Sequence, residues 1–355
     1  MISLLNSEQT YILPEYKEAE GEFIELVNCE DLDRSLAEDP IIGEFFLEKL
    51  DFAIHKAYAS DEEDDCSHLF IQRCLYYVNR LKLFWYDDLN NYSNENSRFL
   101  FDIRSKIEKQ WVAWEEKQIS VGHLKTVKVD QALRDRVEAD LNPKLLDEGK
   151  YIRDCISEEG YQRLLAIASL DGLVEASQLS RVLGGAGSDV QLMLTKILWE
   201  EYGGGKLERK HSSHFAAMLE EVGMDSRPEA YFDLAPWEVL ANINHSFVLS
   251  EQKRKFLRYV GGLLFIEVSV PASFRNNQLA GERLGISQEA TSYWDIHIKE
   301  DIRHGQWMLE DVALPLAEMY ERDAWEIVLG YDQQKFISAR ASRAIVDSIR
   351  KADDD

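Results

Sequence analysis

Cysteine and basic residues are scarce in this 355-residue sequence, and their scarcity argues against several protein classes. The four cysteines are scattered without a CxxC pair, so neither a zinc knuckle nor a disulfide framework is indicated, and a reducing, cytoplasmic location is expected. With 40 basic and 65 acidic residues the net charge is −25, which repels phosphate backbones and anionic membrane surfaces. We therefore expect no nucleic-acid partner.

Long apolar runs are also missing from the sequence. The N-terminus lacks the basic start and continuous apolar core of a signal peptide, so we expect no export. The longest apolar window, residues 261–270, is shorter than the roughly 20 residues that a membrane span needs. This window also contains Glu267. We therefore expect no membrane-spanning segment.

Proline is rare as well, with seven residues, and the alternation typical of strands is scarce. Apolar residues recur mostly at a spacing of three to four, which predicts an all-α protein. We place an N-terminal helical domain at residues 1–125, with helices at 41–58, 69–89 and 98–117, and a second domain at 126–355. Residues 119–147 have few large apolar side chains and are interpreted as a linker or irregular crossing. Further helices are expected at 158–170, 172–184, 187–203, 211–223, 234–244, 250–268, 278–285, 288–308 and 310–345.

The segment HIKEDIRHGQW, residues 297–307, contains two histidines and an aspartate at helical spacing. On a helix with about 100° per residue, His297, Asp301 and His304 lie at i, i+4 and i+7 and share a stripe roughly 60° wide. Imidazole and carboxylate groups on one face are candidate metal ligands.

Two further elements contribute candidate ligands. In EEYGGGKLERKH, three glycines separate Glu201 from His211 and allow the chain to turn, so that the two side chains can converge. An exposed turn after a helix end is the simpler interpretation of that segment alone. Glu267 lies in an otherwise apolar helix, where a free carboxylate costs several kcal/mol unless it is paired, protonated or metal-bound. Glu175 is a weaker candidate, because glutamates on amphipathic helices are usually solvated.

Together these positions supply four carboxylates and three imidazoles. Such mixed sets suit iron or manganese, whereas a structural zinc site favours cysteine. Seven ligands are too many for one ion and about right for two. The predicted metal ligands are Glu175, Glu201, His211, Glu267, His297, Asp301 and His304.

This pattern resembles the haem-oxygenase-like di-iron oxidases and oxygenases. That family has an E-Y-G-x-G stretch with a histidine ten residues after the glutamate, a lone glutamate on a helix and, about thirty residues later, an H-x3-D-x2-H motif. Glu201 with His211, then Glu267, then the motif at residues 297–304 match this order. A further family glutamate, about twenty-six residues before the first, corresponds to Glu175. The resemblance covers roughly residues 150–345 and implies a haem-oxygenase-like helical bundle.

The resemblance also implies a function in small-molecule or natural-product metabolism. Two irons would react with O2 as co-substrate through a peroxo-diferric species, and an external electron donor would reduce them. The expected reaction is N-oxygenation of an amine, guanidine or amino-acid substrate. In a multidomain guanidine N-oxygenase of the family, a similar N-terminal helical domain serves dimerisation, so we expect a homodimer. That enzyme also has a cupin domain, which we do not find here, so no rearrangement that depends on a cupin is expected.

Several alternatives stay open at the level of sequence. A di-iron oxidase or lyase of the same family could cleave C–C bonds of an amino acid or fatty acid. A metal-free thiaminase-like or quinone-synthase-like enzyme would not need all seven ligands. A ferritin-like bundle would show two Glu-x-x-His pairs, and only the analogous Asp301-x-x-His304 is present. A non-enzymatic helical interaction protein would require Glu267 to pair with a residue such as Arg258 or Arg303.

Overall fold

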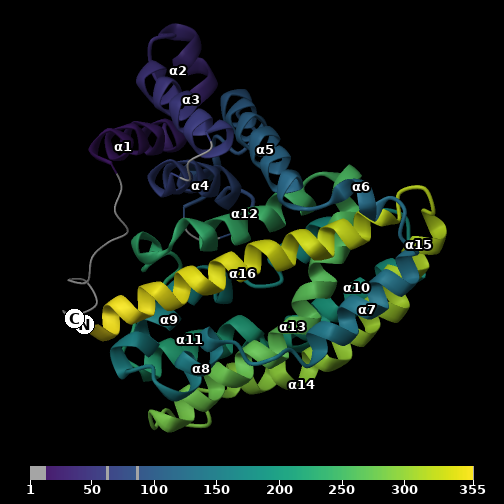
Figure 1. Ribbon diagram of the computed structural model, residues 1–355. Helices are drawn as coiled ribbons and strands as arrows, with labels where there is room; N and C mark the ends of the chain where they lie inside the picture. Colours follow the sequence, from purple (N-terminus) through teal and green to yellow (C-terminus); the bar gives the residue numbers. More distant parts are fainter. Residues whose placement is uncertain (1–12, 61–63, 85–87, 355) are drawn as a thin grey trace. The chain divides into compact units, whose positions relative to one another are not determined.

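The computed structural model describes residues 13–60, 64–84 and 88–354 (Figure 1). Every regular element within these ranges is a helix, so the predicted all-α class is confirmed. The N-terminal stretch, where no signal peptide is expected, lies mostly outside the described residues.

The helices form two compact units, defined by which residues contact one another. The N-terminal unit contains the described parts of residues 9–119 together with 236–248. The main unit contains residues 120–235 and the described part of 249–355. A dimerisation role for the first of these units remains a prediction.

The N-terminal unit is built around stacked aromatic side chains. Its elements are α1 (Pro14–Asn28), α2 (Leu32–Glu38), α3 (Glu44–Ala59), α4 (Asp65–Arg80), the 3₁₀ turn η1 (Leu89–Tyr92), α5 (Arg98–Gln118) and most of α12 (Trp237–Ser250). The ring pairs Tyr16–Phe70 and Phe23–Phe46 stack at 4.8 and 4.4 Å between centroids and join α1 to α4 and α3.

Helix α12 joins this unit although it lies more than a hundred residues further along the chain. Its buried Asn244 donates hydrogen bonds to the carbonyl and the side chain of Gln72, both at 2.9 Å, and accepts one from Asn79 at 3.0 Å. The Trp237 indole donates to Asp65 at 2.9 Å. Buried amides stabilise a fold only when they are paired, so these bonds define how α12 packs.

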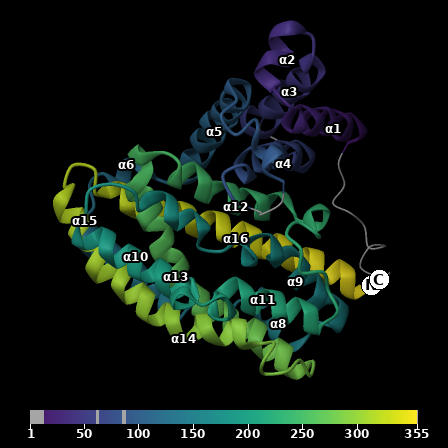
Figure 2. The same cartoon turned by 180° about the vertical axis from the view of Figure 1, so that it is seen from behind.

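The main unit is dominated by three long helices, which Figure 2 shows from the opposite side. They are α13 (Phe256–Arg283), α14 (Ser292–Trp307) and α16 (Trp325–Asp354), and α13 packs against both of the others. The remaining elements are α6 (Val121–Leu124), α7 (Val129–Leu141), α8 (Asp147–Asp154), α9 (Glu158–Gly172), η2 (Ser177–Val182), α10 (Asp189–Glu201), η3 (Gly203–Gly205), η4 (Leu207–Arg209), α11 (His211–Glu221), η5 (Phe232–Leu234), η6 (Lys253–Lys255), the π-helical η7 (Met308–Ala313) and α15 (Leu314–Met319).

Several expected helix boundaries are wrong. Residues 250–268 and 278–285 belong largely to one helix, α13, which continues through Pro271. Its apolar pattern fades between them because residues 269–276 are only partly buried or exposed. The helix expected at 172–184 is only the short η2, because α9 ends at Gly172 and Ala176 adopts a positive φ of 61°. The helix expected at 310–345 is divided among η7, α15 and α16.

The stretch interpreted as a linker contains a regular helix, α7. Three apolar residues, Ala132, Leu133 and Val137, are buried on one face of it. Its polar face is fixed by an ion pair of Arg136 with Asp332 at 2.7 Å. A helix with so few large side chains gives a weak pattern, which explains the missed element.

The segment Lys253–Arg283, which includes α13, is the one candidate among the described residues that is long and apolar enough to cross a membrane. Half of its most apolar window is buried inside the protein, and the core helix of a soluble protein passes the same test of length and composition. Its packing against α14 and α16 gives its apolar face a partner within the chain.

Candidate metal centre

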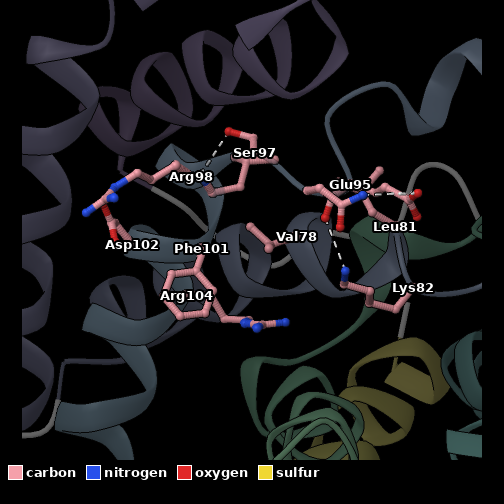
Figure 3. A pocket seen from close by; sticks show the side chains of 11 residues that line it. Val78, Leu81, Lys82, Glu95, Ser97, Arg98, Phe101, Asp102 and Arg104 are labelled. Atoms are coloured by element: carbon pink, nitrogen blue, oxygen red, sulfur yellow. Dashed lines mark hydrogen bonds and ion pairs between the residues drawn. The ribbon is translucent and has the colours of Figure 1, made fainter. Parts of the chain in front are cut away.

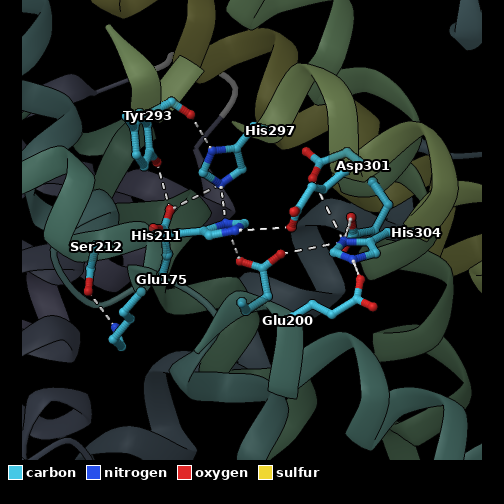
Figure 4. A network of polar contacts seen from close by, with 12 residues as sticks. Glu175, Glu200, His211, Ser212, Tyr293, His297, Asp301 and His304 are labelled. Carbon is cyan, nitrogen blue, oxygen red and sulfur yellow. Dashed lines mark hydrogen bonds and ion pairs between the residues drawn. The ribbon is translucent and has the colours of Figure 1, made fainter. Parts of the chain in front are cut away.

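The seven predicted ligands converge on one region of the main unit, to which four helices and one turn contribute. Figure 4 shows this polar network. Glu201 is the last residue of α10, His211 begins α11, and Glu267 lies in the middle of α13. The remaining residues are His297, Asp301 and His304 on α14 and Glu175 in the turn after α9.

The α14 residues face the interior as the spacing predicts. His297, Asp301 and His304 are 7%, 3% and 0% exposed, while Ile302 on the opposite face is 60% exposed. Helix α14 therefore presents all three side chains to the same interior region.

The glycine turn brings Glu201 and His211 together. Gly203, Gly204 and Gly205 have φ values of 62°, 62° and 81°, a region that favours glycine. A Cβ atom at Gly203 would also overlap the backbone of the residues just before His211. The chain reverses within this turn, and the Glu201 Oε2 and His211 Nδ1 atoms lie 2.9 Å apart. Both side chains are buried, so the exposed-turn interpretation does not hold for these two residues.

One group of potential ligand atoms contains Glu175, His211 and His297. The His297 Nε2 atom lies 3.5 Å from Glu175 Oε2 and 3.2 Å from His211 Nδ1. Glu175 thus reaches the centre from a turn rather than from the helix expected there.

A second group contains Glu201, Glu267 and His304. The His304 Nδ1 atom lies 3.4 Å from Glu201 Oε1, 3.4 Å from Glu267 Oε2 and 3.8 Å from Asp301 Oδ1. Because Glu201 directs Oε2 toward His211 and Oε1 toward His304, its carboxylate lies between the two groups.

Three buried atoms of this centre have no hydrogen-bond partner among the described residues: Glu175 Oε1, Asp301 Oδ1 and His304 Nδ1. An unpaired buried polar atom costs about 1–3 kcal/mol, and more when the group is charged. All three are donor atoms for a metal ion. The chemistry of the residues therefore fits a carboxylate- and imidazole-bound cation.

The pKa shifts reflect a concentration of negative charge. Burial and the charges of Glu267 and Glu201 raise the pKa of Asp301 well above its usual value. Burial also raises the pKa of Glu267. For Glu201, the effect of burial is outweighed by close contacts with His211 and His304, so its pKa is lowered.

The imidazoles respond in the opposite direction. Burial lowers the pKa of His304, but its close contacts with the Glu201 and Glu267 carboxylates outweigh this effect and raise the pKa to about 11. Burial likewise opposes the hydrogen bonds of His211 with Glu201 and Glu300, which raise its pKa to about 10. Protonated imidazoles are thus the cations that balance the buried carboxylates in the metal-free centre.

Neither arginine considered as a partner for Glu267 is placed to explain its burial. Arg258 forms an ion pair with Glu326 at 2.7 Å, and Arg303 forms one with Glu200 at 2.6 Å. The contact of Glu267 with His304 connects it instead to the candidate ligands.

Two carboxylates that are not among the predicted ligands, Glu200 and Glu300, lie at the rim of this region. Together with His304 they form a third group of potential ligand atoms. Glu200 Oε2 lies 2.9 Å from His304 Nε2, and Glu300 Oε2 lies 3.4 Å from His211 Nε2. In the sequence, only their positions next to Glu201 and Asp301 indicate that they lie near the centre. The directions of their side chains, which the structure gives, are needed to show that they contact His304 and His211.

Aromatic side chains cover the end of the centre nearest His297. The Tyr293 hydroxyl donates a hydrogen bond of 2.6 Å to Glu175 Oε2. The ring of Phe274 lies 5.2 Å from that of His297, and Phe215 lies 4.8 Å from Tyr293, both edge-on. Aromatic rings thus surround His297 and the hydrogen bond between Tyr293 and Glu175.

The comparison with protein families agrees with the motifs. Residues 162–333, slightly less than half of the chain, match the haem-oxygenase-like family model described as iron-containing redox enzyme. The haem-oxygenase-like resemblance is confirmed. All seven predicted ligands lie inside the matched segment.

A curated relative of this haem-oxygenase-like segment is nitrosourea synthase from Streptomyces achromogenes subsp. streptozoticus. The two proteins are 32% identical over 169 residues, which are 47% of this chain and 36% of that enzyme. The two comparisons support an iron-containing oxidoreductase.

The N-terminal unit contains a separate surface cavity of about 380 Å³ (Figure 3). Its cations have local partners: Lys82 bonds the Glu95 carbonyl at 3.1 Å, and Arg98 approaches Asp102 at 3.7 Å. No histidine lines it among the described residues, so it offers no ligand set like that of the main unit.

Proposed function

We propose that the haem-oxygenase-like segment is a non-haem di-iron oxygenase of small-molecule metabolism that N-oxygenates an amine or guanidine group. The observation that carries the proposal is the convergence of three imidazoles and four carboxylates in one largely buried region. Three of the donor atoms have no hydrogen-bond partner among the residues described, and a bound metal would give them a partner.

The two groups of donor atoms suggest two metal positions. Glu175, His211 and His297 would hold one iron. Glu267, Asp301 and His304 would hold the other. Glu201 would contribute to both positions, since one of its oxygens lies near His211 and the other near His304. A shared carboxylate offsets the repulsion between two cations.

Bound iron would supply oxygen activation, with electrons from an external donor. The protein's own contribution is geometry and protonation. Helix α14 fixes two imidazoles and one carboxylate on a rigid element, and the aromatic side chains beside Tyr293 line one end of the centre. His211 and His304 carry protons in the metal-free state and must release them to become ligands.

The similarity to nitrosourea synthase supports N-oxygenation over C–C cleavage as the reaction type. A metal-free thiaminase-like or quinone-synthase-like enzyme is a weaker explanation. Such an enzyme would have to keep Asp301 Oδ1 and Glu175 Oε1 buried without a hydrogen-bond partner in the described structure. The homodimer, the external donor and the cytoplasmic location remain predictions that accompany this proposal.

The test is an anaerobic titration of the metal-free protein with Fe²⁺, followed by rapid mixing with O2. We expect uptake close to two irons per chain and a transient visible absorption. Asp301→Asn should weaken iron uptake and abolish the transient. Asp295→Asn is a matched control, because Asp295 lies on the same helix, is 36% exposed and pairs with Lys299.

Product analysis under ¹⁸O2 then separates the reaction types. N-oxygenation of a panel of amines and guanidines yields a product that keeps all its carbon atoms and gains ¹⁸O on nitrogen. C–C cleavage yields a product with fewer carbon atoms and would overturn the N-oxygenase assignment. Failure to take up iron would overturn the proposal as a whole.

A further inference from the structure

The three histidines of the centre are arranged in the same way. Each ring has one nitrogen directed toward the candidate ligands and the other directed toward an oxygen acceptor outside them. For His297, the outer atom is Nδ1, which lies 2.8 Å from the backbone carbonyl of Tyr293. Its inner atom, Nε2, faces Glu175.

In His304 the roles of the two nitrogens are exchanged. Its Nε2 atom lies 2.9 Å from Glu200 Oε2, whereas its Nδ1 atom faces Glu201 and Glu267. His211 repeats this pattern, with Nε2 3.4 Å from Glu300 Oε2 and Nδ1 2.9 Å from Glu201 Oε2. Two rings thus separate the interior carboxylates from a pair of rim carboxylates.

The outer partners decide which nitrogen can bind a metal. With a metal bound to the inner carboxylates, the outer oxygens remain as hydrogen-bond acceptors. Carbonyl and ionised carboxylate oxygens only accept hydrogen bonds, so the outer nitrogen that faces them carries the hydrogen. In a neutral imidazole the other nitrogen then has its lone pair free. This assigns Nε2 of His297, but Nδ1 of His211 and His304, as the ligating atoms.

We propose that Glu200 and Glu300 are positioning residues that hold His304 and His211 in the tautomer with Nδ1 free for metal. This inference rests on the proposed metal centre. In known metal sites, carboxylates that accept a hydrogen bond from a ligating histidine orient the ring and raise its basicity, and their loss typically weakens metal binding 10–100-fold.

Burial and charge favour this role over a third metal position at the rim. The Glu200 and Glu300 side chains are 24% and 35% exposed, compared with 9% for Glu201. Glu200 already has a cationic partner, because Arg303 Nη2 lies 2.6 Å from the oxygen that faces His304. That ion pair fixes the carboxylate against the ring without a metal.

The experiment titrates metal-free protein with Co²⁺ under anaerobic conditions and follows the visible absorption. Glu200→Gln and Glu300→Gln each replace an obligate acceptor with an amide that can also donate, which permits the unwanted tautomer. Glu208→Gln is the matched control, an exposed glutamate of η4. Thermal unfolding of each metal-free variant checks that the fold is retained.

We expect Co²⁺ affinity to fall at least tenfold in each rim variant and to change less than twofold in the control, with the number of ions per chain unchanged. In ¹⁵N-histidine-labelled protein loaded with Zn²⁺, the rings of His211 and His304 should carry hydrogen on Nε2. A residue that merely stabilised the fold would lower the unfolding temperature without altering this tautomer.

Unchanged affinity in both rim variants, or hydrogen on Nδ1 of these rings, would overturn the inference. Loss of one whole equivalent of Co²⁺ would also overturn it, because Glu200 and Glu300 would then be direct ligands. If the unaltered protein bound no Co²⁺, the proposed function would fail together with the inference. If the protein bound metal with an affinity that did not depend on Glu200 or Glu300, the inference would fail but the proposed function would stand.

Discussion

At the scale of single residues, the centre depends on side chains that are costly to bury alone. Glu267 and Asp301 are 6% and 3% exposed, and the contact of each with His304 places it beside a potential counter-ion. The need of Glu267 for a partner followed from its apolar neighbours in the sequence. The identity of that partner did not, because it comes from another helix.

Tyr293 holds two candidate ligands at once, which makes it a useful residue to alter. Its hydroxyl donates to Glu175, and its carbonyl accepts from His297. Tyr293→Phe removes only the first bond and leaves a buried carboxylate oxygen without its donor. We expect Fe²⁺ affinity to fall about tenfold, the lower end of the range for outer partners of metal ligands.

Equilibrium titration with Fe²⁺ measures this effect. Tyr320→Phe serves as the control, since that side chain is 46% exposed and lies in the turn after α15. Equal affinities for the two variants would contradict the role assigned to the Tyr293 hydroxyl.

At the scale of elements, the packing of α13 on α16 depends on close backbone contact. A Cβ atom at Gly261 would overlap the Ile327 carbonyl, and one at Gly330 would overlap the Arg258 carbonyl. Gly262, one residue along, has its nearest neighbour at an ordinary 3.5 Å. Because Glu267 lies on α13, this contact also helps to set the position of its carboxylate in the interior.

Gly261→Ala and Gly262→Ala therefore form a matched pair. Both gain about 1 kcal/mol of helix propensity. The first must also separate two backbones, and overpacking typically costs about 1–3 kcal/mol. We expect Gly261→Ala to lower the free energy of unfolding relative to Gly262→Ala by at least about 1 kcal/mol, measured by urea denaturation. Equal stabilities would show that α13 and α16 can shift apart freely.

Elements were predictable where one face is strongly apolar. The expected helix at 211–223 closely matches α11, His211–Glu221. Prediction failed where burial is partial, as along the middle of α13, or where few apolar side chains are buried, as in α7. Backbone conformation also limited the prediction of helices. Ala176, the residue after Glu175, has a positive φ, and the pattern of apolar residues cannot reveal this.

At the scale of the whole molecule, the net charge of −25 and the buried carboxylates favour binding of cations. In the metal-free state, His211 and His304 have pKa values of about 10 and 11, so both carry protons at pH 7. A metal must displace those protons. We expect proton release on Fe²⁺ binding and an apparent affinity that increases as pH rises from 7 toward 10.

Calorimetry in buffers of different ionisation enthalpy counts the protons released. The stability of the metal-free protein should change in the opposite direction. The raised imidazole pKa values stabilise the fold fully below the usual value of 6.5, and this contribution is lost as pH rises through about 10–11. Binding without proton release would contradict the protonated state assigned to these rings.

The sequence by itself determined the all-α class and the candidate ligands, because helical spacing and residue chemistry are local properties. His297, Asp301 and His304 needed only a helix to share a face, and Glu201 and His211 needed only a turn. The tertiary structure alone decided that α12 packs with the N-terminal unit, and that Glu200 and Glu300 face the outer nitrogens of two histidines. These contacts join segments that are far apart in the chain. They depend on how closely helices approach one another and on how the histidine rings are oriented, and a local sequence pattern specifies neither.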